Sequence, residues 1–174
     1  MPFVAQDTLE NFRMRASSEP EAQFMEHCPR DVLVIREVVS EQDSEGFLTQ
    51  RGAGRRMPGL DWVVALQKRE GANPFSHMVT IGRAENNDVI LQSSSVSKFH
   101  AYLTEVDGER FIADAGSSLG TFLGPERLVP RKAVKLPRGE TLRLGESLVT
   151  YCTAADLLDR LLSGRPVLAT AGQG

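Results

Sequence analysis

Short apolar runs alternating with turn residues dominate the sequence from residue 60 to residue 152. Each run is long enough for one strand and rich in β-branched or aromatic residues, with Gly, Pro, Asn or Asp in the connections, the pattern of an all-β sandwich. Asp107-Gly108 separates two runs and is a strong signal for a tight hairpin. The runs are Trp62–Leu66, Met78–Ile81, Val89–Leu91, Ala101–Val106, Arg110–Ala113, Thr121–Leu123, Ala133–Leu136, Thr141–Leu144 and Leu148–Tyr151. We therefore expect a mainly β protein with an antiparallel β-sandwich over residues 60–152.

The first 39 residues predict two short helices and a strand. An acidic start of capping-box type favours a helix over about Asp7–Ala16. A second helix is expected to start at Ser18–Glu21, with a cap residue and a proline tolerated in the first turn, and Pro29 blocks its extension. The β-branched run Val32–Ile35 predicts a strand that needs a partner. We expect residues 1–39 to be an N-terminal extension that packs against the sandwich.

Residues 40–59 mix acids, glycines and Pro58 with little periodic hydrophobicity, which predicts a linker or long surface loop. We interpret its basic cluster, Arg51, Arg55 and Arg56, as part of a solvated linker. After the sandwich, Thr153 is expected to cap a short helix over residues 153–164 that stops at Gly164. We expect residues 165–174 to form a flexible tail. Short helical additions are thus expected at both ends of the sandwich.

Charge and composition argue against several classes of function. The 174-residue chain has a net charge of −3 and a pI near 5.7, which opposes a chain-wide surface for nucleic acid or anionic membrane. No run approaches the ~20 apolar residues that span a bilayer, and the N-terminus lacks a basic start followed by an apolar block. Cys28 and Cys152 fit no metal-ligand spacing, so we expect no metal, no cofactor and a cytoplasmic location. We find no catalytic constellation and expect no enzyme.

A local anion site is nevertheless indicated. Arg83 follows Gly82 at a strand end, where glycine permits a sharp turn and a guanidinium can fork onto phosphate oxygens. Ser97 offers a hydroxyl donor, and Lys98 adds a second cation in the next loop. The polar turn Asn86-Asn87-Asp88 is expected to hold its loop through side-chain to backbone hydrogen bonds. A phosphothreonine, with about two negative charges and three acceptor oxygens, needs such a set of donors on loops of a rigid scaffold.

Four separated motifs between about residues 60 and 152 carry a family resemblance because they occur in one order: Ile81–Arg83, Asn87–Leu91, Ser95–Ala101 and Asp114–Thr121. In that order they resemble the forkhead-associated (FHA) domain. The resemblance implies an eleven-strand β-sandwich whose loops at one end bind a phosphothreonine peptide. It implies that Arg83 and Ser97 contact the phosphate, that Lys98 assists, and that Ser118 contacts the phosphothreonine or nearby peptide backbone. Residues that would support the site structurally are Gly82, His100, Gly120 and Thr121, with His100 bracing the binding loop.

One position departs from the family pattern. Family members usually carry Asn immediately before the glycine that corresponds to Gly120, and here that residue is Leu119. The asparagine amide grips the main chain of the ligand, whereas leucine neither donates nor accepts. Losing this contact is expected to cost about 1–3 kcal/mol, or about tenfold to a hundredfold in affinity. The alternative is that Leu119 makes an apolar contact with the peptide and alters selectivity.

Each candidate residue also has a purely structural interpretation. Arg83 could be a surface arginine, Ser97 a local backbone cap, and Lys98 a solvated charge. Ser118 could belong to a simple polar turn, and Leu119 could cover nearby core. The full set of motifs favours phosphate contact over these readings for Arg83 and Ser97, and leaves both readings open for the other three.

The sequence therefore predicts a phosphothreonine-peptide-binding signalling or adaptor module that acts downstream of a Ser/Thr kinase. Its partner would be a phosphothreonine-containing protein, either a Ser/Thr kinase or a substrate of one. The alternative is a divergent FHA scaffold that mediates a phosphate-independent protein–protein interaction. A third hypothesis is a ligand in cis, because Thr8, Ser17, Ser18 and Thr49 lie outside the predicted sandwich and a flexible linker could bring a phosphorylated residue to Arg83.

Overall fold

The computed structural model describes residues 6–38, 56–57 and 59–169. The helices are α1 (Leu9–Ser18), α2 (Glu21–His27) and α4 (Ala154–Ser163). The strands are β1 (Gln6–Thr8), β2 (Asp31–Arg36), β3 (Asp61–Ala65), β4 (Val79–Gly82), β5 (Val89–Ile90), β6 (Ala101–Val106), β7 (Glu109–Asp114), β8 (Thr121–Leu123), β9 (Glu126–Arg127), β10 (Val134–Lys135), β11 (Thr141–Leu144) and β12 (Ser147–Thr153). The predicted mainly β fold is confirmed, although the described residues hold one strand more than the eleven that the family resemblance implies.

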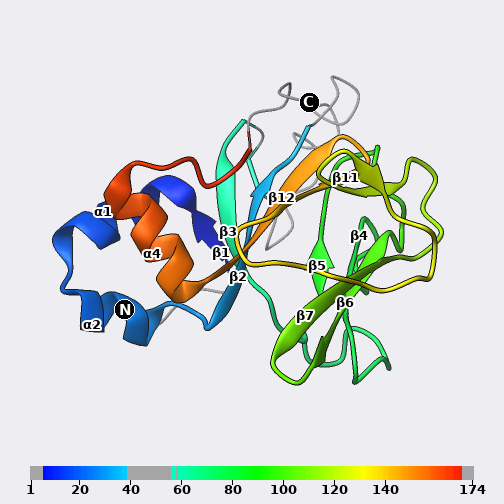
Figure 1. The fold of residues 1–174 in the computed structure, drawn as a ribbon, viewed down its shortest axis with the longest axis horizontal. Helices are drawn as coiled ribbons and strands as arrows, with labels where there is room; N and C mark the ends of the chain where they lie inside the picture. Colours follow the sequence, from blue (N-terminus) through cyan, green and yellow to red (C-terminus); the bar gives the residue numbers. More distant parts are fainter. Residues whose placement is uncertain (1–5, 39–55, 58, 170–174) are drawn as a thin grey trace.

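Two sheets face each other and form the sandwich (Figure 1). The larger sheet has seven strands in the order β1-β3-β2-β12-β11-β8-β9, and the smaller has five in the order β10-β7-β6-β4-β5. The β4–β5 pair is parallel, and the other described pairs are antiparallel. The β6–β7 hairpin turns at Asp107 and Gly108, with φ values of 52° and 77°, as their sequence predicts.

The strand predicted near residues 32–35 is an inner strand of the larger sheet. β2 pairs with β3 on one side and with β12 on the other, and Val32, Leu33, Val34 and Ile35 are fully buried. Without β2, the facing edges of β3 and β12 would leave backbone donors and acceptors unpaired in the interior. The N-terminal segment therefore contributes a strand to the sandwich itself, which differs from the expected packing of an extension against a sandwich that begins at residue 60.

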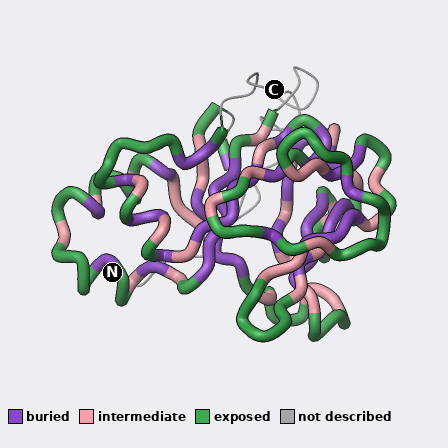
Figure 2. The backbone as a smooth tube through the Cα atoms, viewed as in Figure 1, coloured by how far each residue is buried: buried purple, intermediate pink, exposed green. Residues whose placement is uncertain are grey.

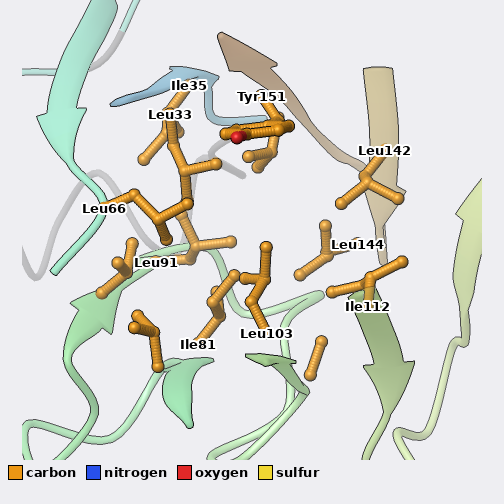
Figure 3. Close-up of a cluster of buried hydrophobic side chains, with 14 of the residues drawn as sticks. Leu33, Ile35, Leu66, Ile81, Leu91, Leu103, Ile112, Leu142, Leu144 and Tyr151 are labelled. Atoms are coloured by element: carbon orange, nitrogen blue, oxygen red, sulfur yellow. The ribbon is translucent and has the colours of Figure 1, made fainter. Parts of the chain in front are cut away.

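Apolar side chains fill the space between the two sheets. Alternate residues of β6, Ala101 and Leu103, are buried, while Tyr102 and Thr104 between them are partly exposed, as the two-residue period of a strand requires. Figure 3 shows side chains from both sheets meeting in this core, among them Leu33, Ile81 and Leu103. The packing holds the ends of β4, β6 and β7, and hence the loops that leave them.

A second core lies on the other face of the larger sheet. Helices α1, α2 and α4 cover that face in Figure 1, and Figure 2 shows buried residues both beneath the helices and between the sheets. Phe12 and Phe24 from α1 and α2 are fully buried and pack edge to face with ring centroids 6.1 Å apart. Val167 and Leu168 are also buried in this cluster, so the expected flexible tail is wrong for these two residues; residues 170–174 lie outside the described part of the chain.

The helix ends correct two sequence predictions. Thr8 is the N-cap of α1, because its Oγ1 accepts a hydrogen bond from Asn11 N at 3.2 Å, whereas Asp7 belongs to β1 and pairs with Val63. Helix α2 begins after Pro20, which occupies its N-cap position without a side-chain cap, so Ser18 does not cap it. Helix α4 has the predicted Thr153 cap and Gly164 stop, with φ of 70° at the glycine.

Arg56 differs most from its predicted place in a solvated linker. Its side chain is only 3% exposed, and it donates to Glu37 at 2.8 Å, to Gln6 at 3.2 Å and to the carbonyl of Ile90. Glu37, 7% exposed, also accepts from Gln92 N at 2.6 Å. This buried ion pair joins the segment after β2 to the segment before β3, and the hydrogen bonds with Ile90 and Gln92 tie both segments to the end of β5. The other arginines of the cluster, Arg51 and Arg55, lie outside the described residues.

We expect Arg56→Met to lower the free energy of unfolding by about 3–5 kcal/mol, because the change leaves the Glu37 carboxylate buried without its cation. Chemical denaturation followed by circular dichroism measures this loss. The control is Arg36→Met, which removes an exposed ion pair with Asp61 and should cost at most about 1 kcal/mol. Equal losses in the two variants would contradict a structural role for the Arg56–Glu37 pair.

Candidate functional site

Three connections meet at one end of the sandwich: residues 83–88 after β4, residues 91–100 before β6 and residues 115–120 before β8. Backbone hydrogen bonds join them to one another and to the strand ends, so the end of the sandwich is rigidly held. These bonds run from Arg83 N to Ser97 O at 3.0 Å, from Ala84 N to Lys98 O at 3.1 Å, from His100 N to Ile81 O at 2.9 Å and from Ala115 N to His100 O at 2.9 Å.

Gly82 is required by this close approach of two loops. A Cβ atom at Gly82 would overlap the carbonyl oxygen of Lys98 and would lie 2.8 Å from Asn87 Nδ2. The same Nδ2 donates to Ala84 O at 2.8 Å and to Lys98 O at 2.6 Å, and Asp88 accepts from Arg69 N and Thr80 N. The predicted role of the Asn86-Asn87-Asp88 turn in holding its loop is therefore confirmed.

His100 is fully buried between the second and third loops. Its Nδ1 lies 3.0 Å from Ser97 N, and its Nε2 lies 3.1 Å from Gly120 O. The Ser97 amide can only donate, so Nδ1 is the acceptor and the ring proton is on Nε2, which donates to Gly120 O. Burial lowers the pKa of His100, and the Gly120 carbonyl and the Asp114 carboxylate only partly oppose this shift. One neutral imidazole thus ties the Ser97 loop to the Gly120 loop.

Asp114 organises the third loop through a set of short-range hydrogen bonds. Its Oδ2 accepts from Gly116 N at 2.8 Å and Ser117 N at 3.0 Å, while its Oδ1 accepts from Ser117 Oγ at 2.5 Å and from the buried hydroxyl of Thr121 at 2.7 Å. Burial alone would raise the pKa of Asp114, but these hydrogen bonds outweigh it and hold the pKa below its usual value. The carboxylate is therefore ionised at neutral pH and fixes the turn before Gly120. Nothing in our sequence analysis assigned this role, although an Asp followed at short range by Gly and Ser is typical of such turns.

Arg83, Ser97, Lys98 and Ser118 all lie on these loops. Arg83 Nε donates to Val96 O at 3.0 Å, which orients the guanidinium, and its terminal nitrogens have no acceptor within the described residues. Ser97 Oγ accepts from Ser118 N at 3.0 Å, and its own proton has only a long contact, 3.5 Å, to Ser118 Oγ. Lys98 is exposed and forms no ion pair with any described residue. The arrangement leaves cationic and hydroxyl donors available to an anion.

Leu119 is exposed beside this donor set, with 51% of its surface accessible. That exposure does not fit the interpretation in which Leu119 covers nearby core. Its neighbour Gly120 has φ of 87°, a conformation that favours glycine. The third loop thus presents an apolar side chain where an amide would be expected from the family resemblance.

Two further arginines that the sequence analysis missed lie close to this loop. A Cβ atom at Gly120 would be 2.7 Å from Arg127 Nε, so the Arg127 side chain lies directly against Gly120. Arg143 donates to Gly145 O at 2.8 Å, and Gly145 N donates to Gly120 O at 3.2 Å. Both arginines are brought to this loop by the pairing of strands that are distant in the sequence, and no local motif indicates their position.

The opposite end of the sandwich holds a cavity of about 270 Å³. Its lining includes Glu105 and Arg110, which pair with each other at 3.0 Å, and Arg110 also pairs with buried Asp31 at 2.8 Å. Because these charges are paired within the protein, the cavity gives no argument for a charged ligand. Among the described residues there is neither a group of three or more side chains that could hold a metal nor a helix able to cross a membrane.

We expect the free energy of unfolding to fall as the pH is lowered from about 6.5 toward 5, because the unfolded chain then binds a proton at His100 that the folded chain resists. The stability that depends on neutral His100 is complete above the unfolded pKa and is lost as pH falls through this window, by at most about 1.4 kcal/mol per pH unit. Urea unfolding at several pH values measures it. His100→Gln should lose this dependence, whereas His77→Gln, at an exposed position, should keep it. A wild-type slope that survives in His100→Gln would contradict the assignment.

Comparison with known proteins identifies the domain. The family model described as "FHA domain" matches residues 79–145, which include all three loops of the site. The FHA domain-containing protein FhaB of Mycolicibacterium smegmatis is 35% identical over 71 residues, which are 41% of this chain and 44% of FhaB. The transcriptional regulatory protein EmbR of Mycobacterium tuberculosis is 35% identical over 124 residues, which are 71% of this chain and 28% of EmbR. The chain thus spans less than half the length of these relatives.

Solved structures are similar to part of this chain. A structure of Mycobacterium tuberculosis EmbR in complex with a low-affinity phosphopeptide has a TM-score of 0.41 and 32% identity, and the match covers 44% of this chain and 20% of that one. The solution structure of an FHA domain of an Arabidopsis thaliana hypothetical protein has a TM-score of 0.49 and 21% identity, with 72% and 86% covered. Residues 79–145, which carry the three loops of the site, therefore match the forkhead-associated domain.

Proposed function

We propose that this chain is a phosphothreonine-peptide-binding module of a signalling or adaptor protein that acts downstream of a Ser/Thr kinase. The observation that carries the proposal is the set of donors on the rigid loops, above all the terminal nitrogens of Arg83, which have no acceptor among the described residues, beside the Ser97 hydroxyl. The match of residues 79–145 to the FHA family supports it. The partner would be a phosphothreonine-containing protein, either a kinase or a kinase substrate.

In the proposed complex, Arg83 forks onto two phosphate oxygens while its Nε stays on Val96 O. Ser97 donates its hydroxyl proton to a phosphate oxygen and keeps its bond from Ser118 N, so this donor is held in place before the ligand arrives. Lys98 adds charge from the loop edge. Ser118 contacts the phosphothreonine or nearby peptide through its hydroxyl. Preformed loops reduce the conformational entropy lost on binding, which favours affinity.

The supporting residues act by position in this proposal. Gly82 permits the approach of the Lys98 carbonyl, and His100 holds Ser97 N and Gly120 O at the same time. Thr121 and Gly120 are fixed through Asp114 and Ser117. No group in this set needs to transfer a proton or form a covalent bond, so we propose a binding protein and not an enzyme, with no cofactor. Two buried free cysteines are compatible with a reducing compartment, and we propose the cytoplasm.

The hypothesis of a ligand in cis has less support at Thr8. Thr8 caps α1 and its strand pairs with β3 at Trp62, so presenting Thr8 in an extended peptide would require β1 and the start of α1 to separate from the sheet. Ser17 and Ser18 are exposed on α1, and Thr49 lies outside the described residues. We therefore favour a ligand supplied by another protein.

The function is tested by titrating the protein with a phosphothreonine peptide library, with unphosphorylated and phosphoserine libraries in parallel. We expect binding that requires phosphothreonine and that weakens about tenfold to a hundredfold in Arg83→Ala, because a charge-assisted hydrogen-bonding partner is lost. Isothermal titration calorimetry on a selected peptide gives the affinities.

The matched control is Arg13→Ala, which removes an exposed arginine from α1 and should leave the affinity unchanged. Thermal unfolding of each variant checks that it is folded. Binding that is equal with and without the phosphate, or equal in wild type and Arg83→Ala, would contradict the proposal and favour a phosphate-independent scaffold that presents the exposed Leu119 surface.

Leu119→Asn tests the departure from the family pattern. We expect this change to strengthen binding of the same phosphothreonine peptide by about tenfold, because the new amide can donate to and accept from the peptide backbone. Leu119→Ala is the control, since it removes the apolar side chain without adding an amide. A gain in both variants would show that the leucine merely obstructs the peptide, and a loss in both would show that its apolar contact matters more than the absent amide.

A further inference from the structure

Arg127, Phe122 and Arg143 form a row across three neighbouring strands of the larger sheet. β8 lies between β9 and β11, and Phe122 is directly opposite Arg127 on one side and Arg143 on the other. Directly opposed residues in an antiparallel pair project from the same face. The buried residues Leu142 and Leu144 flank Arg143 on β11, so the row is on the solvent face of the sheet. We call these three residues the arginine row.

The guanidinium groups of both arginines lie over the ring of Phe122, Arg143 much closer than Arg127. The Arg127 Cζ atom is 5.9 Å and the Arg143 Cζ atom is 3.8 Å from the centroid of Phe122. Stacking on an aromatic face holds a guanidinium while leaving its N–H groups at the edge free for other acceptors. Phe122 thus positions two cations that would otherwise be mobile on a solvent-facing surface.

The positive charges of the row have no acidic partner within the described part of the chain. Arg143 donates to the carbonyl of Gly145, and the Arg127 side chain has no hydrogen bond or ion pair to any described residue, whereas most other described arginines form an ion pair or bond a backbone carbonyl. This occurs in a chain whose acids outnumber its bases, 23 to 20. Two like charges on one small patch repel each other, and an anion bound between them would relieve that repulsion.

The row is continuous with the phosphate-binding loops. Arg127 lies against Gly120, and Arg143 reaches the same glycine through Gly145, whose amide donates to Gly120 O. Ser118 and Leu119 immediately precede that glycine. A peptide held by Arg83 and Ser97 that runs past Leu119 would therefore meet the arginine row next.

We propose that the arginine row binds an acidic side chain of the phosphothreonine peptide and so selects peptides with Asp or Glu near the phosphothreonine. The inference rests on the proposed function, since it needs a peptide anchored at Arg83. The arginine row would be a second, charge-based contact with the peptide in a domain where Leu119 cannot form hydrogen bonds with the peptide backbone. Its ligand is a carboxylate on the same chain as the phosphate, so two separated anions define the substrate class.

The test compares two phosphothreonine peptides, one with alanine at the flanking positions and one with Asp or Glu placed on either side. We expect the wild-type protein to prefer the acidic peptide, and the double variant Arg127→Gln/Arg143→Gln to reduce that preference by about threefold to tenfold, the scale of two solvent-exposed ion pairs. Affinity for the alanine peptide should stay within about twofold of wild type in the double variant, because the expected effect requires the acidic side chain.

Controls separate local contact from net charge and from folding. Arg13→Gln/Arg165→Gln changes the net charge by the same amount away from the loops and should preserve the preference for the acidic peptide. Arg127→Lys/Arg143→Lys keeps the charges and should retain part of the preference. If the phosphothreonine peptides bind but the preference is absent, or is unchanged in the Arg→Gln double variant, the inference is overturned while the proposed function stands. If binding does not depend on the phosphate at all, both are overturned.

Discussion

Burial of aliphatic side chains between the two sheets is the constraint on which the site depends. Ile81 and Ala101 are both fully buried and pair with each other across β4 and β6. The neighbouring residues, Gly82 before the first loop and His100 at the end of the second, are therefore held at fixed points. Ile112 fixes β7 in the same core, and Asp114 ends that strand two residues later. The packed strand ends therefore restrict the conformations of each loop before any polar contact forms. The polar contacts select one arrangement from the few that the packed strand ends permit.

His100 joins the second and third of these anchored loops. Its two ring nitrogens have opposite roles, acceptor for Ser97 N and donor to Gly120 O, and only the neutral ring can perform both. Protonation would place a second N–H against the Ser97 amide and would leave a buried donor unpaired. The burial that lowers the pKa of His100 is thus the same burial that makes its two hydrogen bonds structurally strong. Asp114 acts in parallel on the third loop, where its ionised carboxylate collects donors from the turn and from Thr121.

The sequence predicted correctly those elements whose conformation depends on residues close together in the chain. The β6–β7 hairpin, the capped helix α4 and the strand run from residue 60 onward each have their signal within a few residues, and the loop motifs follow those strands in a fixed order. What the sequence did not reveal depends on pairing between distant segments. β2 looked like part of an extension because nothing local shows that β3 and β12 are its neighbours, and Arg56 looked solvated because its partner Glu37 is 19 residues away. Arg127 and Arg143 were missed for the same reason, since only the order β9-β8-β11 brings them to one ring.

Replacing an amide by Leu119 shifts how this domain can recognise a peptide. A backbone-gripping asparagine is indifferent to the peptide's side chains, so it adds affinity without choosing among sequences. Cations beside the phosphate site act differently, because they raise the affinity only for peptides with a negative charge at a matching position. Such contacts are also screened by salt over about 10 Å at 0.1 M, whereas a backbone hydrogen bond is much less so. A domain that exposes Leu119 and positions Arg127 and Arg143 on Phe122 therefore obtains its selectivity through charge, and its binding should respond to ionic strength more steeply than binding through Arg83 alone.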